Sequence, residues 1–548
     1  MQPSTHAKRD FALLLAGVAL AYFYGLGRAP FIGSDEPRYA EVAREMYTRG
    51  DLVTPTLAGH TWFEKPALAY WAEMAGFQLF GVSEWSARLG AALAGWLTVL
   101  LLGWMCGRVE RRALGELRGL QLTCAGVMAS SAGLIAFSRG VNFDIFLTAT
   151  VAVSLACYFV SGLEDDARRR RLLLAGFYAG VGLALLAKGL VGIVIPFGVV
   201  GCYQLLLCRF PPSVKSLLWG VPLALLVAAT WYAPVTIAHG PAFINQFFIQ
   251  HHFARFVSNR FHHPQPFYFF LLILPLLTLP WTPFFFASLK NLWHDRRRLR
   301  AEVDDRTSIS LRLFALAWVF VPVAFFSLSH SKLPGYILPA LPGAALLAGE
   351  ELWRFVRGGG SRWAMCVAGV FLLTGACAVL AYSARTGLIG MTCALFVAAP
   401  LVCGGLWALW SKGARGRTAG VVVGVTLLTV MIATVYAFGG ATRRESVRDL
   451  LRLADARGYG ATPVLNLYDI ERSSEFYAAG RVVYNEHGEP KMFDGVNLIS
   501  DYARAHREMV LVIVPVANVN QLAAPGMARF EVIGDNGVHA LAAVFGDR

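Results

Sequence analysis

The sequence carries little charge for its length. Only 15% of its 548 residues are Asp, Glu, Lys or Arg, against about 25% in an ordinary soluble domain. Hydrophobic residues make up 56%, and the mean hydropathy is +0.52. These values exclude a soluble cytoplasmic enzyme and a disordered chain, and they place most of the chain in a membrane.

Cysteine pairs, internal repeats and charges within apolar stretches are also scarce or absent. All nine cysteines, from Cys106 to Cys403, lie in or at the ends of apolar stretches, and none forms a CxxC pair. We therefore expect neither a disulfide framework nor a thiolate metal site. Most apolar stretches are free of charge, which argues against a transporter or pump, because those proteins place ionisable groups near the bilayer middle.

Thirteen apolar stretches are long enough to cross a bilayer, which takes about 20 residues per helix. They lie, within a few residues, at 11–27, 87–106, 117–137, 143–163, 172–187, 190–208, 217–237, 267–289, 309–328, 334–353, 363–384, 388–410 and 418–439.

The net charge of +14 is explained by the distribution of basic residues along this pattern. With the amino terminus inside, the inner segments hold 25 of the 49 Lys and Arg, and the outer loops hold 12. This is the positive-inside bias of membrane proteins, so no nucleic-acid partner is needed to explain the charge. Thirteen crossings then place the carboxyl-terminal tail outside.

The tail after residue 440 lacks the long apolar stretches of the rest of the chain and contains short strand and helix patterns instead. Residues 1–440 are predicted to form a transmembrane domain with long outer loops at 28–86 and 238–266. Residues 441–548 are predicted to form a separate small α/β domain, large enough for its own core. Its expected strands and helices are at 464–468, 482–484 and 510–514, and at 445–457 and 497–507.

The first of four polar clusters in the predicted outer loops is Gly33-Ser34-Asp35-Glu36-Pro37-Arg38-Tyr39. It opens a segment with apolar residues at helical spacing, which predicts an amphipathic helix on the membrane surface. Its expected polar side carries Arg38, Glu41, Glu45 and Arg49. Ser34 can cap this helix, and Asp35 and Glu36 suit its positive end. The spacing leaves open whether the two acids only start the helix or also act on a ligand.

The second cluster is Trp62-Phe63-Glu64-Lys65-Pro66, placed where the chain passes from water to lipid. Lys65 is either an anchor that extends to the interface or a phosphate-binding group. In the second interpretation, Glu64 beside it binds a metal or a sugar.

The third cluster is in the 238–266 loop and consists of His251, His252, Arg255, Arg260, His262 and His263. Histidine clusters bind zinc, but no HxxxH pair or cysteine partner is present. The fourth cluster is Ser329-His330-Ser331-Lys332-Leu333-Pro334-Gly335-Tyr336, and Arg139 and Asp144 lie at the outer end of another hairpin. Each of these is a helix-end anchor, half of a structural ion pair, or a site residue.

Together the four clusters favour one site over four unrelated anchors. Basic side chains suit a phosphate, aromatic side chains suit a sugar ring, and a position at lipid level suits a substrate with a long tail. The motifs of these four clusters resemble those of the bacterial 4-amino-4-deoxy-L-arabinose lipid A transferases. Those enzymes belong to the protein-O-mannosyltransferase-like, GT-C-type membrane glycosyltransferases. Where family members often carry Glu-His in the third outer loop, this chain has His251-His252.

The resemblance implies a polytopic α-helical protein of the bacterial inner membrane, with a cytoplasmic amino terminus and a periplasmic α/β carboxyl-terminal domain. It implies transfer of aminoarabinose from undecaprenyl phosphate to lipid A, which confers polymyxin resistance. A related polyprenyl-phosphate transferase, such as a protein O-mannosyltransferase, and a lipid flippase are the alternatives.

The resemblance also implies roles for individual residues, in a protein expected to be a monomer. Asp35, Glu36 and Lys65 are expected to be catalytic. The expected substrate-binding residues are Arg38, Tyr39, Asp144, Arg255, Lys332 and Tyr336. Glu64 and His252 are the expected ligands of a divalent metal, with zinc the first candidate.

Overall fold

The computed structural model describes residues 3–208, 214–254, 265–295, 306–411, 413–486, 488–525 and 528–546. The chain divides into two compact units. The first comprises Met1–Leu26, Phe63–Ala69 and Arg88–Ala433, and the second comprises Gly27–Trp62, Tyr70–Ala87 and Thr434–Arg548. Parts of the long loop after the first helix therefore cluster with the carboxyl-terminal tail.

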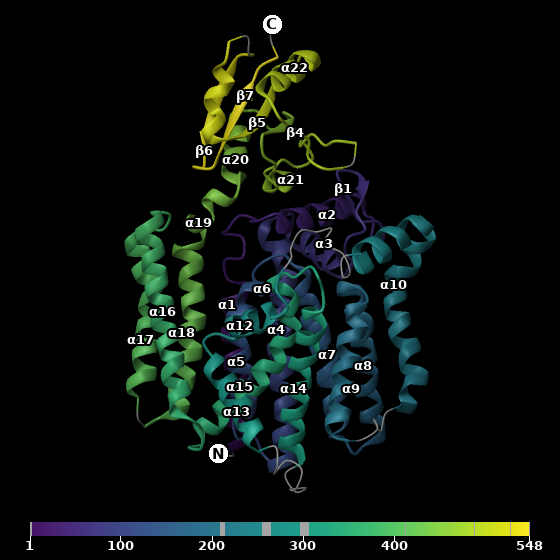
Figure 1. Ribbon diagram of the computed structural model, residues 1–548, viewed down its shortest axis with the longest axis vertical. Coiled ribbons are helices and arrows are strands. Elements are labelled where there is room, and N and C mark those ends of the chain that lie inside the picture. The colour runs from purple at the N-terminus through teal and green to yellow at the C-terminus, as the bar shows by residue number, and fades with distance from the viewer. Residues whose placement is uncertain are drawn as a thin grey trace. The chain divides into compact units, whose positions relative to one another are not determined.

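The first unit is helical, and its long helices run side by side (Figure 1). In chain order they are α1 (Pro3–Phe23), α4 (Glu84–Leu114, from Arg88 on), α5 (Leu120–Ala129), α6 (Ala132–Ser138), α7 (Phe143–Ser161), α8 (Ala167–Lys188), α9 (Val191–Leu206), η1 (Val214–Ser216), α10 (Leu217–Phe243), η2 (Ile244–Ala254), α12 (Phe269–Leu277), α13 (Thr282–Asp295), α14 (Arg306–Ser327), η3 (Pro334–Ala340), α15 (Leu341–Val356), α16 (Arg362–Thr386), α17 (Met391–Trp410) and α18 (Arg415–Tyr436). Helices α7 and α8 pack along each other, as do α16 and α17, and α5 and α15.

The helices confirm a multi-pass membrane architecture. Within the described ranges, eight helices are long and apolar enough to cross a membrane, or ten if each bent pair is one span. The bent pairs are α5 with α6, at 58°, and α12 with α13, at 118°. Each of the thirteen predicted stretches overlaps a helix or a bent pair, but α1, α9 and α15 are not among the eight. The number thirteen therefore stays a prediction.

The second unit contains the tail domain and the segments around α2. Its elements are α2 (Asp35–Arg49), β1 (Thr56–Leu57), β2 (His60–Thr61), most of α3 (Leu68–Phe80), α19 (Phe438–Ala441), η4 (Arg443–Glu445), α20 (Arg448–Ala456), β3 (Val464–Leu467), α21 (Ser473–Tyr477), β4 (Met492–Phe493), α22 (Val496–His506), β5 (Val510–Pro515), η5 (Val516–Ala523), β6 (Phe530–Asp535) and β7 (His539–Val544).

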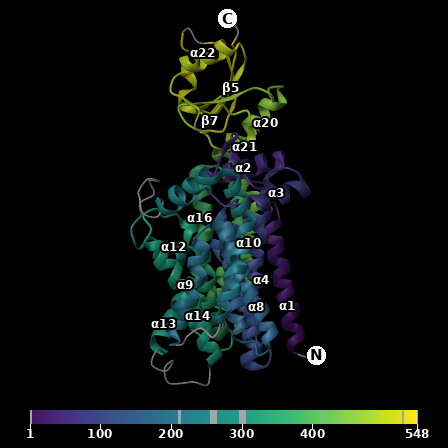
Figure 2. The ribbon, with the colours of Figure 1, turned by 90° about the vertical axis from the view of Figure 1, so that its right-hand side faces the viewer.

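The tail forms one five-stranded sheet in the order β4-β3-β5-β7-β6. Strands β4, β3 and β5 are parallel, and β7 and β6 are antiparallel to their neighbours. Apolar residues of α22 pack on one face of the sheet and those of α20 on the other (Figure 2). This confirms the predicted α/β fold of the tail.

One predicted strand of the tail is wrong. Residues 482–484 form only two isolated bridges, Val464 with Val482 and Tyr484 with Pro490. A short apolar run predicts extended backbone, but a strand also requires a continuous ladder of hydrogen bonds with a neighbour, which a local pattern does not report.

Candidate functional site

An ion pair between the ends of α7 and α8 forms the centre of the candidate site in the first unit. Asn142 caps α7 by accepting a hydrogen bond from the amide of Ile145 at 3.0 Å, and Asp144 follows in the first turn. Lys188, the last residue of α8, donates from Nζ to Oδ1 of Asp144. Its ammonium lies 4.2 Å from the ring centroid of Tyr336, a cation–π contact. The structure thus brings together Asp144 and Tyr336, which the sequence analysis named separately.

Gly335 allows this close approach. A Cβ atom at this position would overlap Oδ2 of Asp144 and would lie 2.8 Å from a ring carbon of Phe137. The segment around Gly335, the 3₁₀ helix η3, packs against α7. Only glycine therefore lets η3 place Tyr336 over Lys188 while the Asp144 carboxylate keeps its position.

Lys332 is buried, and its ammonium donates hydrogen bonds to backbone carbonyls of nearby loop residues. Its Nζ donates to the carbonyl oxygens of Gln265, at 3.1 Å, and Ser329. Burial lowers the pKa of Lys332. Two carbonyls stabilise an ammonium without neutralising it, so Lys332 supplies positive charge to this end of the helices.

Lys65 and Glu64 form a second ion pair in the same unit, with Nζ 2.9 Å from Oε1. Both side chains are mostly buried. The preceding residue, Phe63, anchors the segment by packing edge-to-face against His239 and Phe243, with ring centroids 4.9 and 5.2 Å away. The Phe-Glu-Lys-Pro sequence is therefore held by aromatic contacts with α10, and its two charged groups engage each other.

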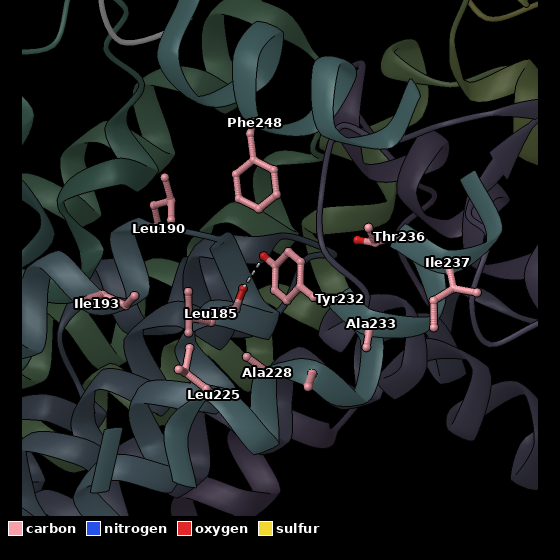
Figure 3. Close-up of a pocket in the computed structure, with 11 residues that line it drawn as sticks. Leu185, Leu190, Ile193, Leu225, Ala228, Tyr232, Ala233, Thr236, Ile237 and Phe248 are labelled. Atoms are coloured by element: carbon pink, nitrogen blue, oxygen red, sulfur yellow. Dashed lines mark hydrogen bonds between the residues drawn. The ribbon is translucent and has the colours of Figure 1, made fainter. Parts of the chain in front are cut away.

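An apolar cavity of about 590 Å³ lies among α8, α9, α10 and η2. Figure 3 shows Leu185, Leu190, Ile193, Leu225 and Phe248 around it, with Thr236 and Ile237 at one side. The hydroxyl of Tyr232 donates to the carbonyl of Leu185 at 3.1 Å, which satisfies the phenol.

The cavity wall adjoins the ion pair in sequence. Leu185 and Leu190 both line the cavity, and Lys188 lies between them at the end of α8. The carboxyl-terminal end of α8 therefore contributes both to the cavity wall, through Leu185, and to the ion pair, through Lys188.

The Asp35-Glu36 cluster lies in the second unit. Asp35 and Glu36 are the first two residues of α2, and Gly33 before them has a φ of 69°. Ser34 makes no side-chain capping hydrogen bond, so the predicted cap is wrong. Instead Glu36, which is buried, accepts a hydrogen bond from the amide of Ile32 at 3.1 Å. Asp35 is exposed.

The predicted polar side of α2 is largely covered. Glu41 is buried and paired with Arg44, while Glu45 accepts hydrogen bonds from the amides of Ala58 and Gly59. Burial raises the pKa of Glu41 to about 7, against the opposing effect of Arg44. The expected polar side of α2 is therefore covered at Glu41 and partly exposed at Glu45. Helical spacing identifies which residues share a face but not what covers it.

Arg38 and Tyr39 also make contacts within the second unit. Tyr39 is buried, and the guanidinium of Arg38 lies 5.3 Å from the ring centroid of Trp62. Arg38 Nε is 3.9 Å from Oε2 of Glu475 in the tail. An acidic partner from the tail was not expected from the sequence.

Lys188 and Arg139 show what the sequence analysis missed and what it left open. Lys188 lies between the predicted spans 172–187 and 190–208, and the sequence analysis did not name it as a site residue, although a lone charge between two apolar stretches was its available signal. Arg139 donates to the carbonyls of Ala21, Tyr22 and Tyr24, at 2.7, 3.1 and 3.0 Å. It is a helix-end anchor for α1.

The described residues do not build the expected metal centre. Glu64 is in an ion pair with Lys65, the side chain of His252 and all of Arg255 lie outside what the structure describes, and no three His, Cys, Asp or Glu gather elsewhere in the described ranges. A carboxylate paired with an ammonium does not by itself fit a cation, so we derive no step through a metal.

Comparisons with known proteins agree with this architecture. Residues 32–258 match the family described as dolichyl-phosphate-mannose-protein mannosyltransferase. The chain is also similar to undecaprenyl phosphate-alpha-4-amino-4-deoxy-L-arabinose arabinosyl transferases. That of Pseudomonas aeruginosa is 33% identical over 358 residues, 65% of this chain and 61% of the relative. That of Aeromonas salmonicida is 32% identical over 345 residues, 61% of this chain and 58% of the relative. The match thus spans less than two thirds of the length of either relative.

Two crystal structures of ArnT from Cupriavidus metallidurans share the fold over nearly the whole chain. The one bound to undecaprenyl phosphate gives a TM-score of 0.75 at 23% identity, with 97% of both chains covered. The apo structure gives 0.76 at 24% identity, with 98% of this chain and 99% of the other covered. At these identities the likeness establishes the fold.

Proposed function

We propose that this chain moves 4-amino-4-deoxy-L-arabinose from undecaprenyl phosphate to a phosphate of lipid A. The match of residues 32–258 to the mannosyltransferase family and the similarity to aminoarabinose transferases support this proposal. The proposed place of the reaction is the periplasmic face of a bacterial inner membrane. There the added amine would reduce the anionic charge of lipopolysaccharide and confer polymyxin resistance.

The observation that carries the proposal is that the end of α8 contributes both to the ion pair of Lys188 and Asp144 and to the wall of an apolar cavity. A donor of this class has a phosphate joined to a long hydrocarbon chain, so its site needs cationic groups next to an apolar surface. Lys188 lies between Leu185 and Leu190, two residues of the cavity wall. This arrangement supports a lipid-linked phosphate donor over a soluble sugar nucleotide.

The proposed chemistry is a single displacement. An oxygen of the acceptor phosphate forms a bond to the anomeric carbon, while the bond from that carbon to undecaprenyl phosphate breaks and the leaving phosphate takes the electron pair. The transition state resembles an oxocarbenium ion, by analogy with glycoside hydrolysis. Negative charge develops on the leaving phosphate, which the ammonium and guanidinium groups of Lys65, Arg38 and Arg255 would stabilise.

Asp35, Glu36, Asp144 and Tyr336 would act on the sugar and the acceptor. An acceptor phosphate is already an anion and needs little help from a base, so a carboxylate such as Asp35 would orient it or hold the sugar amine. With a hydroxyl acceptor the same carboxylate would take the proton. Tyr39 and Lys332 complete the proposed binding residues.

The test is mass spectrometry of lipid A from cells without their own transferase that express this chain. We expect a mass increase of one aminoarabinose, and unmodified lipid A together with a glycosylated protein would instead favour the O-mannosyltransferase alternative. Identical lipid A with and without the gene, and no other glycosylated product, would contradict transferase activity.

Variants at the ion pair connect this activity to the site. Lys188→Met removes the ammonium, and Asp144→Asn removes its counter-charge. Because a charge-assisted hydrogen bond contributes about 1.5–3 kcal/mol, each should lower transfer about tenfold to a hundredfold with purified donor. Lys215→Met, which changes an exposed lysine of η1, is the matched control and should retain wild-type transfer.

A further inference from the structure

Three consecutive residues of the tail helix α21 each contact a different part of the chain around the start of α2. Glu475 faces Arg38 at 3.9 Å. The carbonyl of Phe476 accepts a hydrogen bond from Nη1 of Arg44 at 2.9 Å. The hydroxyl of Tyr477 accepts one from the amide of Phe31 at 2.8 Å. These contacts lie on both sides of Asp35 and Glu36.

The contacts are reinforced by packing. The ring of Phe31 meets that of Phe476 edge-to-face with centroids 4.8 Å apart, and the Arg44 guanidinium lies 5.1 Å from the Phe476 ring centroid. The Tyr477 hydroxyl also donates to Oε1 of Glu84 at 3.2 Å. Such aromatic and cation–π contacts add to the area buried.

Helix α21 is itself fixed to the tail domain. Oε1 of Glu471 accepts the amide of Ser473 at 2.9 Å, and Oγ of Ser473 accepts the amide of Val447 at 3.0 Å. Glu475 is fully buried, and its Oε1 is held by Arg472 at 2.8 Å. A helix of five residues is not stable alone, so these bonds set its position.

Among the three contacts of α21 described above, that between Glu475 and Arg38 joins a negative and a positive side chain. Oε2 of Glu475 and Nε of Arg38 are both buried, and neither has a hydrogen-bond partner among the described residues. A buried acceptor and a buried donor without hydrogen-bond partners destabilise the fold unless they compensate each other electrostatically. Since Ser34 gives α2 no side-chain cap, the start of this helix depends on contacts from outside it.

We propose that Glu475 is a positioning residue: through Arg38, α21 holds the start of α2 in the conformation that presents Asp35 and Glu36 for catalysis. This gives the tail domain a part in the reaction, and it rests on the proposed function for its kinetic consequence. The carboxylate acts on Arg38 through its charge, at 3.9 Å, so the isosteric and neutral Glu475→Gln is the informative substitution.

The first experiment needs no activity. Hydrogen exchange is measured by mass spectrometry on the full-length protein in detergent, for peptides covering residues 31–40 and 496–506. In Glu475→Gln we expect exchange in 31–40 to be about tenfold faster or more, from loss of the charged interaction. Exchange in α22 should be unchanged. Unchanged exchange in 31–40 overturns the proposal even if the protein proves to have another activity.

The second experiment measures transfer kinetics on the same preparations. We expect kcat to fall about tenfold or more in Glu475→Gln, with the donor KM within twofold, because misplacing a catalytic group affects the transition state more than donor binding. A purely structural loss would reduce the amount of folded protein but leave kcat per folded molecule intact, and that outcome overturns the proposal.

Glu489→Gln is the matched control. Glu489 pairs with the other guanidinium nitrogen of Arg472, at 2.6 Å, so this variant removes a neighbouring carboxylate but keeps the facing pair of Glu475 and Arg38. It should match the wild type in both experiments, and an equal loss would contradict a specific role for Glu475. If Glu475→Gln is not recovered folded, Tyr477→Phe must accelerate exchange in 31–40, and failure to do so overturns the proposal.

Discussion

At the scale of single residues, the substitution Gly335→Ala tests the arrangement around Asp144, because it adds one methyl group beside that carboxylate. In Gly335→Ala the new Cβ would overlap the Asp144 carboxylate, so either η3 or that carboxylate must move. We expect transfer to fall at least about tenfold, since small displacements of reacting groups have large effects on rate. Steady-state kinetics measure this fall.

The control for this variant is Gly201→Ala in α9, where an added Cβ meets no atom within 4 Å. It should leave transfer unchanged and raise the melting temperature slightly, because alanine favours a helix more than glycine does. Full activity in Gly335→Ala would separate η3 from the site.

Glu73 is a second residue with a measurable consequence. It lies on α3 and is buried, and neither of its oxygens has a hydrogen-bond partner among the residues described. Burial raises the pKa of Glu73 well above its ordinary value, and the nearby Glu36 raises it further. The folded protein therefore holds Glu73 as a neutral acid at pH values where the unfolded chain has lost the proton.

This difference predicts a pH dependence of stability. A raised folded pKa contributes stability that is fully present below the unfolded pKa of 4.5 and is lost as pH rises toward the folded pKa. We expect Glu73→Gln, a neutral isostere, to remove that decline. Melting temperatures in detergent from pH 4 upward should fall less steeply in the variant, and parallel curves would mean that Glu73 does not titrate abnormally.

At the scale of elements, α10 supplies most of the residues that line the cavity. Ala233 lines it from α10 and is exposed, so Ala233→Trp would fill part of the 590 Å³ without disturbing a buried core. We expect the KM for the undecaprenyl-linked donor to rise about tenfold, on the scale of lost apolar burial. A donor with a much shorter chain should be affected less.

Leu226→Trp, on the same helix but outside the cavity, is its control and should match the wild type. Equal effects of Ala233→Trp on long and short donors would mean that the cavity does not hold the donor chain. A rise in the KM for lipid A alone would assign the cavity to the acceptor.

At the scale of the whole molecule, the untested feature is which side of the membrane holds the tail. Thirteen spans from an inside amino terminus place it outside. An alkaline phosphatase fused after the last residue should therefore be active in cells, since that enzyme folds only outside the cytoplasm. A fluorescent protein at the same place should be dark when exported through the general secretion route.

The opposite pair of results, an inactive phosphatase and a bright fluorescent fusion, would contradict the count of thirteen. The structure allows eight to ten spans by length and composition among the residues it describes, so the count depends on how the bent pairs and the shorter helices are treated. The fusion experiment answers this independently of any activity.

The sequence by itself determined the order of the membrane-length helices and part of the elements of the tail. Apolar stretches of membrane length are local features, and each overlaps a helix or a bent pair. The surface helix predicted to start at the Asp35-Glu36 cluster is α2, and the tail strands predicted at 464–468 and 510–514 are β3 and β5. Helical and strand periodicities arise from the backbone itself, so a short window of sequence contains them.

Only the tertiary structure decided which side chains meet. Lys188 is 44 residues from Asp144, and Glu475 is far from Arg38 in sequence, so no local pattern joins either pair. Glu41 is likewise buried on α2, and α2 packs against α21, which follows all the membrane helices in the chain. Charge pairing and burial depend on distances in space, and those are set only when separate elements pack.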